Sequence, residues 1–209
     1  MRHPATMLRR QSAPRLYGNR VMLRPLTEGD YVAWREVRLR NEPWLLPWEP
    51  QRQTHVADPS RDQSAYNVRC DARDRERASD HAYPFGVFVD HQFAGEVNLN
   101  NVSRGALQGG SVGYWIDQQR AGKGYIAESV VVLARYAFEQ LSLHRLEVCI
   151  VPRNTKSRRV MEKLEFRCEG IAERFLEIAG VWEDHLRFAI TVEEWNDRRD
   201  NLMTAWITG

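Results

Sequence analysis

The chain has 209 residues, of which 43% are hydrophobic and 28% are charged, with a formal net charge of +2. This charge is too small to argue for nucleic-acid binding, and no apolar run reaches the roughly 18 residues that a membrane span requires. Three widely spaced cysteines without metal-ligand spacing indicate a reduced, cytoplasmic chain with no metal site. We therefore expect one globular protein without direct nucleic-acid binding or membrane association.

The first residues differ from the rest of the chain. Residues 1–15 carry four arginines and little apolar content, and they lack the apolar segment of a secretory signal. We predict that residues 1–15 form a mobile basic tail and that residues 16–209 form a single domain.

Hydrophobic periodicity predicts the elements of the first half: a strand over 20–26, a helix over 28–40, a polar helix over 58–80 and a hairpin of strands over 85–89 and 93–99. Thr27 should cap the first helix, with Asp30 at the third helical position. Asp58 and Pro59 should begin the second helix as N-cap and first residue.

The segment between these two helices is unusual. Residues 44–50 contain two tryptophans and two prolines without periodicity and directly follow Pro43, which predicts a stiff apolar loop. This loop either plugs the core or lets Trp44 and Trp48 form an aromatic wall of an acceptor pocket.

Alternation along the second hairpin strand places three polar residues together. Glu96, Asn98 and Asn100 should share one face, and Val97 and Leu99 the other.

A strand over 111–117, a two-glycine turn and a helix over 124–140 predict an anion cradle. The first N–H groups of a helix have no partner within it and lie at the positive end of its dipole. Gly122 and Gly124 allow a phosphate to approach the backbone, and Arg120 and Lys123 add positive charge. The spacing fits neither the dinucleotide fingerprint nor the P-loop.

The last third predicts a strand over 144–151, a basic helix from Asn154 to Leu164, strands over 166–178 and 185–191, and a terminal amphipathic helix over 191–206. Asn154 should cap the basic helix. The terminal helix should pack through Trp195, Leu202 and Trp206. Strands therefore cluster in the middle, and helices follow strands near the end, which is typical of a mixed α+β fold.

Several motifs together resemble one family. They are Gln119-x-x-Gly122-x-Gly124, the preceding run 112–116, Asn154-x-x-Ser157, and Phe166-x-x-Glu169-Gly170. The chain resembles the GNAT acetyltransferases, in the branch of Rim-type ribosomal-protein-alanine N-acetyltransferases, over roughly residues 17–195. The resemblance implies a central, mostly antiparallel sheet splayed between two strands, with helices on both faces. One departure is Glu165, where the family usually has a glycine that closes the helix.

The resemblance also implies acetyl-CoA as the cofactor. Its pyrophosphate would lie on the two-glycine turn, and its pantetheine arm would pair with the strand over 111–117. The residues expected to bind it are Ile116, Gln119, Arg120, Ala121, Gly122, Lys123, Gly124, Asn154 and Ser157. Asn154 would either bind an amide group of the cofactor or only cap the basic helix that it begins.

Direct transfer to an amine requires a proton for the leaving thiolate, which Ser157 could supply unless its hydroxyl only caps the helix. The family's carboxylate base falls on Leu176, with Glu177 beside it. Glu177, Glu96 and a water chain through Asn98 and Asn100 remain open as the base.

The implied acceptor is the N-terminal α-amine of a protein, such as a ribosomal protein. It would be contacted by Trp44, Trp48, Asn98 and Asn100. The alternatives are a small-amine or antibiotic acetyltransferase, a coenzyme-A-binding protein without catalysis, and a nucleotide-binding protein. The sequence leaves the oligomeric state open between monomer and homodimer.

Overall fold

The computed structural model describes residues 14–53 and 55–208, so most of the predicted tail lies outside the described residues. The strands are Leu16–Tyr17 (β1), Val21–Arg24 (β2), Tyr83–Val89 (β3), Gln92–Ser103 (β4), Gly109–Ile116 (β5), Arg145–Ile150 (β6), Arg167–Ile178 (β7) and Val181–Thr191 (β8). The helices are Tyr31–Arg40 (α1), Glu42–Leu45 (α2), Gln63–Ala78 (α3), Tyr125–Arg135 (α4), Thr155–Lys163 (α5) and Val192–Trp206 (α6). Single helical turns of other pitch occupy Glu28–Asp30 (η1), Leu46–Trp48 (η2), Gln118–Arg120 (η3) and Tyr136–Gln140 (η4).

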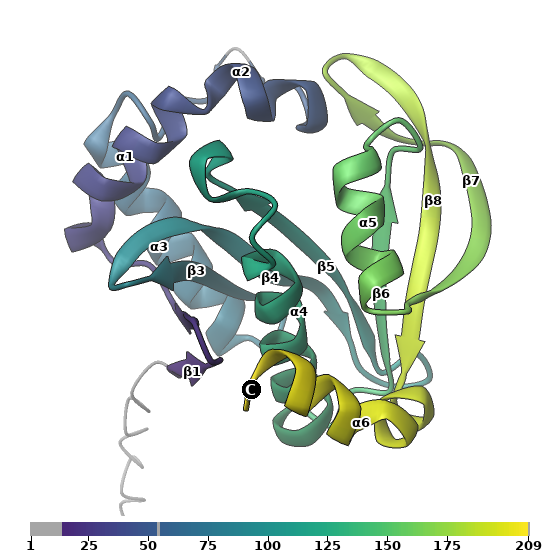
Figure 1. Cartoon of the computed structure of the whole chain (residues 1–209). Coiled ribbons are helices and arrows are strands. Elements are labelled where there is room, and N and C mark those ends of the chain that lie inside the picture. Colours follow the sequence, from purple (N-terminus) through teal and green to yellow (C-terminus); the bar gives the residue numbers. More distant parts are fainter. Residues whose placement is uncertain (1–13, 54, 209) are drawn as a thin grey trace, which may run out of the picture.

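The described strands form one sheet in the order β1-β2-β3-β4-β5-β6-β8-β7 (Figure 1). Neighbouring strands are antiparallel except β5 and β6, which are parallel and joined through α4. Their pairing covers only Gly109–Ser111 against Arg145–Glu147, and beyond this point the two strands diverge. The expected splayed, mostly antiparallel sheet is confirmed.

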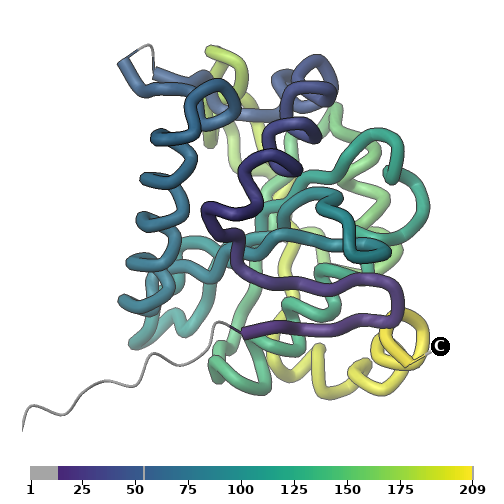
Figure 2. The backbone as a smooth tube through the Cα atoms, turned by 90° about the vertical axis from the view of Figure 1, so that its left-hand side faces the viewer, coloured from purple at the N-terminus to yellow at the C-terminus, as the bar shows by residue number. Residues whose placement is uncertain are grey.

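Helices cover both faces of the sheet. Helices α1 and α3 close one face over an aromatic cluster built around Trp34, Tyr66 and Phe93. Figure 2 shows α3 standing along this side of the molecule. On the other face α4 is buried along almost its whole length, and Trp195 of α6 packs against the same core. A helix enclosed in this way needs apolar residues around most of its circumference, as the α4 sequence has. Among the helices that the structure describes, none is long and apolar enough to cross a membrane.

The predicted order of elements is confirmed. Strand β4 ends at Ser103 instead of residue 99, and the predicted starts of two other elements are also wrong. Helix α3 begins after Asp62, whose carboxylate accepts hydrogen bonds from the backbone N–H groups of Ser64 (2.8 Å) and Ala65 (3.2 Å). Asp58, the predicted cap, instead closes a turn by accepting from the N–H of Ser60 (2.9 Å). The second error is in β8, which begins at residue 181 because Val181 pairs with Ile178 across a tight hairpin.

Two short elements were not expected. The segment 44–50, predicted to be an irregular loop, includes the end of α2 and all of η2. Pro43 and Pro47 occupy early positions of these two turns, where their missing N–H costs nothing. Strand β1 has only two residues and pairs with β2, so it is too short to show an alternating pattern.

Helix α5 ends in a left-handed residue that is not glycine. Glu165 has φ +53°, and the N–H groups of Glu165 and Phe166 donate to the carbonyls of Glu162 (3.2 Å) and Met161 (3.0 Å). This is the Schellman closure that glycine normally provides. The chain therefore has the usual helix end, but the Cβ of Glu165 makes its left-handed conformation strained.

Candidate active site

A large open cleft lies where β5 and β6 diverge. It is lined by residues of α1, α2, η2, β4, β5, the start of α4 and the start of α5. Because the sheet is open at this point, backbone groups of β5 beyond Ser111 are not paired with β6. The cleft therefore places an unpaired strand edge between two helical walls, as the splayed fold predicts.

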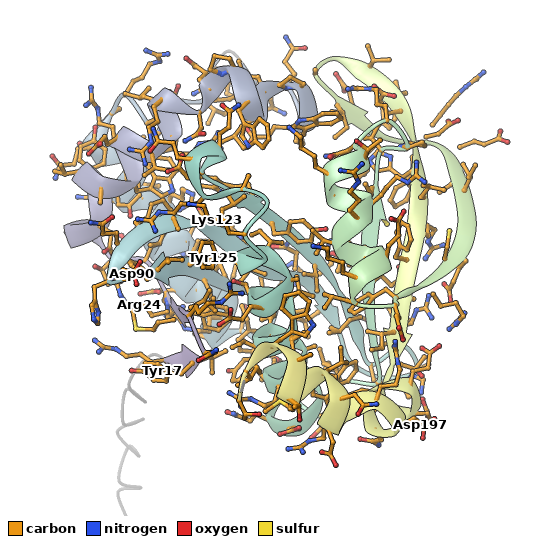
Figure 3. All side chains as sticks on the ribbon, viewed as in Figure 1. Tyr17, Arg24, Asp90, Lys123, Tyr125 and Asp197 are labelled. Atoms are coloured by element: carbon orange, nitrogen blue, oxygen red, sulfur yellow. The ribbon has the colours of Figure 1, made fainter. Side chains whose placement is uncertain are left out.

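The segment from Asp117 to Gly124, which we call the two-glycine loop, leads from β5 into α4. Figure 3 labels Lys123 in this loop and Tyr125 at the start of α4. Gly122 and Gly124 have φ values of +79° and +86°. A Cβ atom built on Gly122 would meet no heavy atom within 4 Å among the described residues, so the space above it is open. Gly122, Gly124 and the first three residues of α4 line the cleft. The first N–H groups of α4 have no partner within the helix, which is the backbone geometry that an anion cradle requires.

Asp117 anchors the beginning of this loop. Its buried carboxylate accepts hydrogen bonds from Arg40 Nη2 (2.5 Å), Asn41 Nδ2 (2.9 Å) and the backbone N–H of Gln119 (3.3 Å). Burial raises the pKa of Asp117, but the hydrogen bonds from Arg40 and Asn41 outweigh burial and leave this pKa below its ordinary value. Sequence reasoning missed Asp117, Arg40 and Asn41, although an Asp directly before a helical turn is a recognisable cap.

The predicted cofactor residues are only partly brought together. Ile116, Arg120, Ala121, Gly122, Gly124, Asn154 and Ser157 all line the cleft. Gln119 and Lys123 belong to the loop but are not among the described lining residues. Arg120 donates to Gln92 Oε1 at 2.6 Å, which holds its guanidinium at the edge of the loop.

Ser157 meets a tyrosine from the opposite wall. Its hydroxyl shares a hydrogen bond of 2.9 Å with the hydroxyl of Tyr114 on β5. The cap of α5 is made instead by Asn154, whose Oδ1 accepts from the backbone N–H of Ser157 (3.1 Å). Burial raises the pKa of Tyr114, with the Ser157 hydrogen bond opposing the shift, so the phenol stays protonated at neutral pH. Two protonated hydroxyls therefore bridge the gap between the diverging strands.

Helical turns α2 and η2 form a roof over the cleft. Trp44 donates from Nε1 to the carbonyl of Ile116 (3.2 Å), and the ammonium of Lys156 lies 3.9 Å from the centroid of its ring. The Arg153 guanidinium lies 4.8 Å from the ring centroid of Trp48. The roof also reaches the β7–β8 hairpin, where the N–H of Ala179 donates to the carbonyl of Glu49 (2.9 Å). Both tryptophans line the cleft, as expected of an aromatic wall.

The floor of the cleft is the polar face of β4. Glu96, Asn98 and Asn100 all line the cleft. Asn98 pairs with Gly113 of β5, where an added Cβ would meet only Asn100 Nδ2, at 3.5 Å, among the described atoms within 4 Å. The buried Oδ1 atom of Asn98 has no hydrogen-bond partner within the described part of the chain. The floor thus combines open space with an unused acceptor.

The two candidate carboxylate bases are placed very differently. Glu96 is fully buried, and its carboxylate accepts from Trp34 Nε1 (2.7 Å) and Arg69 Nη2 (2.5 Å). Burial raises its pKa, but the Arg69 charge and these hydrogen bonds reverse the shift and hold the pKa of Glu96 below its ordinary value. Its basicity is therefore reduced, and each of its two oxygens already accepts one hydrogen bond.

Glu177 lies on the edge strand β7, opposite Trp182, and it is exposed. The register of β7 shifts between Ala172 and Leu176, but neither Leu176 nor Glu177 belongs to the described lining of the cleft. The structure therefore does not bring Glu177 to the two hydroxyls.

The chain was compared with known proteins. A family model described as an acetyltransferase (GNAT) domain matches residues 20–167. The [ribosomal protein uS5]-alanine N-acetyltransferase of Escherichia coli (strain K12) is 31% identical over 189 residues, which cover 88% of this chain and 94% of that protein. The probable N-acetyltransferase YjcK of Bacillus subtilis (strain 168) is 46% identical over 113 residues, covering 53% of this chain and 62% of that protein.

The fold is also that of solved structures. Mycobacterium smegmatis RimJ in complex with CoA-disulfide superposes with a TM-score of 0.83 at 32% identity, covering 92% of this chain and 93% of that one.

Proposed function

This chain belongs to the GNAT acetyltransferase family and uses acetyl-CoA, and on that premise we propose that it acetylates the N-terminal α-amine of a protein, such as a ribosomal protein. The name of the E. coli relative, which specifies an alanine of ribosomal protein uS5, supports this acceptor class. The cleft supports it independently.

The residues of the two-glycine loop fit the cofactor. Open space above Gly122 and unpaired N–H groups at the start of α4 suit a pyrophosphate. The edge of β5 beyond Ser111 suits the amides of a pantetheine arm. When bound, acetyl-CoA supplies the thioester that an acceptor amine attacks.

Ser157 and Tyr114 are proposed to supply the proton for the leaving thiolate. When the Tyr114 hydroxyl donates to Ser157 Oγ, the proton of Ser157 is left free to be donated into the cleft. Because the phenol holds its proton at neutral pH, it can restore the serine after each transfer, and the proton that the acceptor amine releases then returns to the phenolate through solvent.

No side chain need act as a strong base on an α-amine. Such an amine has a pKa near 8, against about 10.4 for lysine, so a fair fraction is neutral at pH 7. Glu96 is a poor base because Arg69 and Trp34 occupy its carboxylate. We propose that Asn98, which lines the cleft and whose buried Oδ1 atom has no partner in the described part of the chain, accepts a hydrogen bond from the amine or from a water that removes its proton.

The charged residues that line the cleft are the main observation in favour of a peptide α-amine as the acceptor. The described lining contains four carboxylates, and each is paired with an arginine: Glu42 with Arg61, Glu49 with Arg38, Asp58 with Arg52 and Glu96 with Arg69. The same lining holds nine arginines and lysines. A polyamine or an aminoglycoside would therefore find no unpaired carboxylate here, whereas a peptide end needs only hydrogen-bond acceptors and an apolar wall.

Two peptides test the proposal. Both begin with alanine and carry one internal lysine, but one has a free N-terminus and the other is blocked. We expect transfer to the α-amine of the free peptide alone, located by mass spectrometry. Equal transfer to the lysine of the blocked peptide, or faster transfer to spermidine or an aminoglycoside, would refute it. No transfer to any amine, with coenzyme A still bound, would instead favour a binding protein without catalysis.

A pair of asparagine variants locates the acceptor site. Asn98→Ala removes the unused acceptor, so KM for the free peptide should rise while KM for acetyl-CoA stays unchanged. Asn101→Ala is the matched control, because Asn101 lies on the same strand but is exposed and donates to Ser111 (3.2 Å). An equal effect of both variants would remove Asn98 from the acceptor site.

A further inference from the structure

Behind the two-glycine loop lies a buried carboxylate that the proposed chemistry does not use. Glu128 is fully buried one turn into α4. Its Oε1 accepts from the backbone N–H groups of Arg20 (2.5 Å) and Val21 (3.0 Å), and its Oε2 accepts from Arg20 Nε (2.9 Å). Glu128 therefore ties the turn between β1 and β2 to the beginning of α4. Figure 2 shows this turn beside the C-terminal end of α6.

The guanidinium that Glu128 aligns also holds the loop itself. Arg20 Nη1 donates to the carbonyl of Lys123 at 3.0 Å. In a planar trans peptide the carbonyl of one residue and the N–H of the next point in opposite directions. A carbonyl of Lys123 fixed toward Arg20 therefore turns the N–H of Gly124 away from Arg20. Gly124 lines the cleft, whereas Arg20 is not among its described lining residues.

Rotation of this peptide plane is otherwise weakly restrained, because Gly124 has no Cβ and a φ of +86°. The side of Gly124 on which a Cβ would stand faces Trp206 and Arg20. A Cβ on Gly124 would lie 3.2 Å from the Trp206 ring and 3.3 Å from Arg20 Nη2. The Arg20 guanidinium also stacks 5.0 Å from the centroid of the Tyr125 ring. These contacts fix Arg20 in place behind the loop.

We propose that Arg20 and Glu128 are positioning residues for acetyl-CoA: they hold the peptide between Lys123 and Gly124 so that the Gly124 N–H faces the pyrophosphate. This inference rests on the proposed role of the two-glycine loop. The residues act through the backbone of the loop and do not touch the donor. A purely structural role, in which they only anchor β1 and β2, makes a different prediction.

The test compares donors that have or lack the pyrophosphate. Arg20→Ala and the wild type are assayed with acetyl-CoA, acetyl-dephospho-CoA and S-acetyl-pantetheine. Loss of one hydrogen bond to a charged group should raise KM for the two pyrophosphate donors roughly 10- to 100-fold, with kcat unchanged. With S-acetyl-pantetheine, kcat/KM should be the same for both proteins. An equal loss with S-acetyl-pantetheine, or no loss with acetyl-CoA, would overturn the proposal.

Arg135→Ala is the matched control. Arg135 lies on the same helix and donates to the carbonyl of Tyr17 in β1 (3.2 Å), so its removal also weakens the attachment of the first strands without touching the loop. Its KM for acetyl-CoA should equal that of the wild type. A rise like that of Arg20→Ala would show that strand anchoring alone is responsible and would overturn the proposal.

Arg20→Lys carries the test if the alanine variant does not fold. A lysine keeps the charge but lacks the planar fork that reaches both Glu128 and Lys123. Its KM should rise about 10-fold for the pyrophosphate donors only. Failure of this inference is distinguishable from failure of the proposed function. If Gly122→Val abolishes coenzyme A binding while both Arg20 variants keep a normal KM, only the positioning role is wrong.

Discussion

The proposed cofactor side of the cleft is largely one continuous stretch, residues 117–127, whereas the proposed acceptor side joins segments such as Pro47 and Arg153 that lie 106 positions apart. On the cofactor side backbone groups are presented by two glycines and a helix start. On the acceptor side the surfaces are side chains held by ion pairs and ring contacts. The first side recognises a constant ligand through the main chain, and the second can vary its specificity by side-chain replacement.

The two sides meet at Tyr114 and Ser157, and breaking this contact should have the largest effect. Ser157→Ala should lower kcat roughly 10- to 10⁴-fold, the range for general acid–base groups, with little change in KM for acetyl-CoA. Tyr114→Phe should lower kcat less, because it leaves the serine proton in place. Steady-state kinetics decide this, and a loss confined to KM would mean that the hydroxyl only binds.

The acceptor side should be sensitive at its buried ion pair. Glu96→Gln leaves Arg69 without its charge partner and should destabilise the fold by about 3 kcal/mol. The lowered pKa of Glu96 means that its stabilisation is present at neutral pH and is lost as pH falls below about 4.5, through its folded pKa. The free energy of unfolding, measured by urea denaturation, should therefore fall more steeply with decreasing pH in the wild type than in the variant. A normal unfolding free energy with a large fall in kcat would identify Glu96 as the base after all.

On the cofactor side, a single added side chain should weaken the binding of coenzyme A. Gly122→Val should raise the Kd for coenzyme A at least about 100-fold, because the side chain fills the space where a pyrophosphate must approach. Gly105→Val is the control, since Gly105 also has a positive φ (+69°) with open space around it, but it does not line the described cleft. Calorimetry that finds equal affinity for Gly122→Val and the wild type would place the cofactor elsewhere.

We expect the smallest effect from a residue that belongs to neither side of the cleft, Glu165 at the end of α5. Glu165→Gly relieves a left-handed residue at the end of α5 and should stabilise the fold by roughly 1 kcal/mol, with kcat and both KM values unchanged. Thermal unfolding measures this. A fall in stability would mean that the contact of the Arg198 guanidinium with the Glu165 side chain (3.5 Å) outweighs the strain.

The contrast between a continuous backbone segment and side chains from distant segments also explains which features could be predicted from the sequence. The two-glycine loop and the cap of α5 could be predicted, because their signals are local residues with fixed backbone requirements. The helical turns of the roof, the Tyr114–Ser157 contact and the Arg20–Glu128 attachment could not, because each depends on segments that meet only after folding. Glu96 was placed on the correct face by alternation, but its partner Arg69 lies on a helix whose orientation the pattern does not contain.

The divergence of β5 from β6 has a consequence for solubility. A strand edge with free N–H and C=O groups is a template on which strands of other molecules can add and aggregate. Here that edge lies within the cleft between α5 and the α2–η2 roof, so these helices flank it on both sides. One of the two outer edges of the same sheet, β7, is protected differently, by two register shifts and by charged residues along its length. The molecule can thus keep one sheet edge open for use without displaying it to its neighbours.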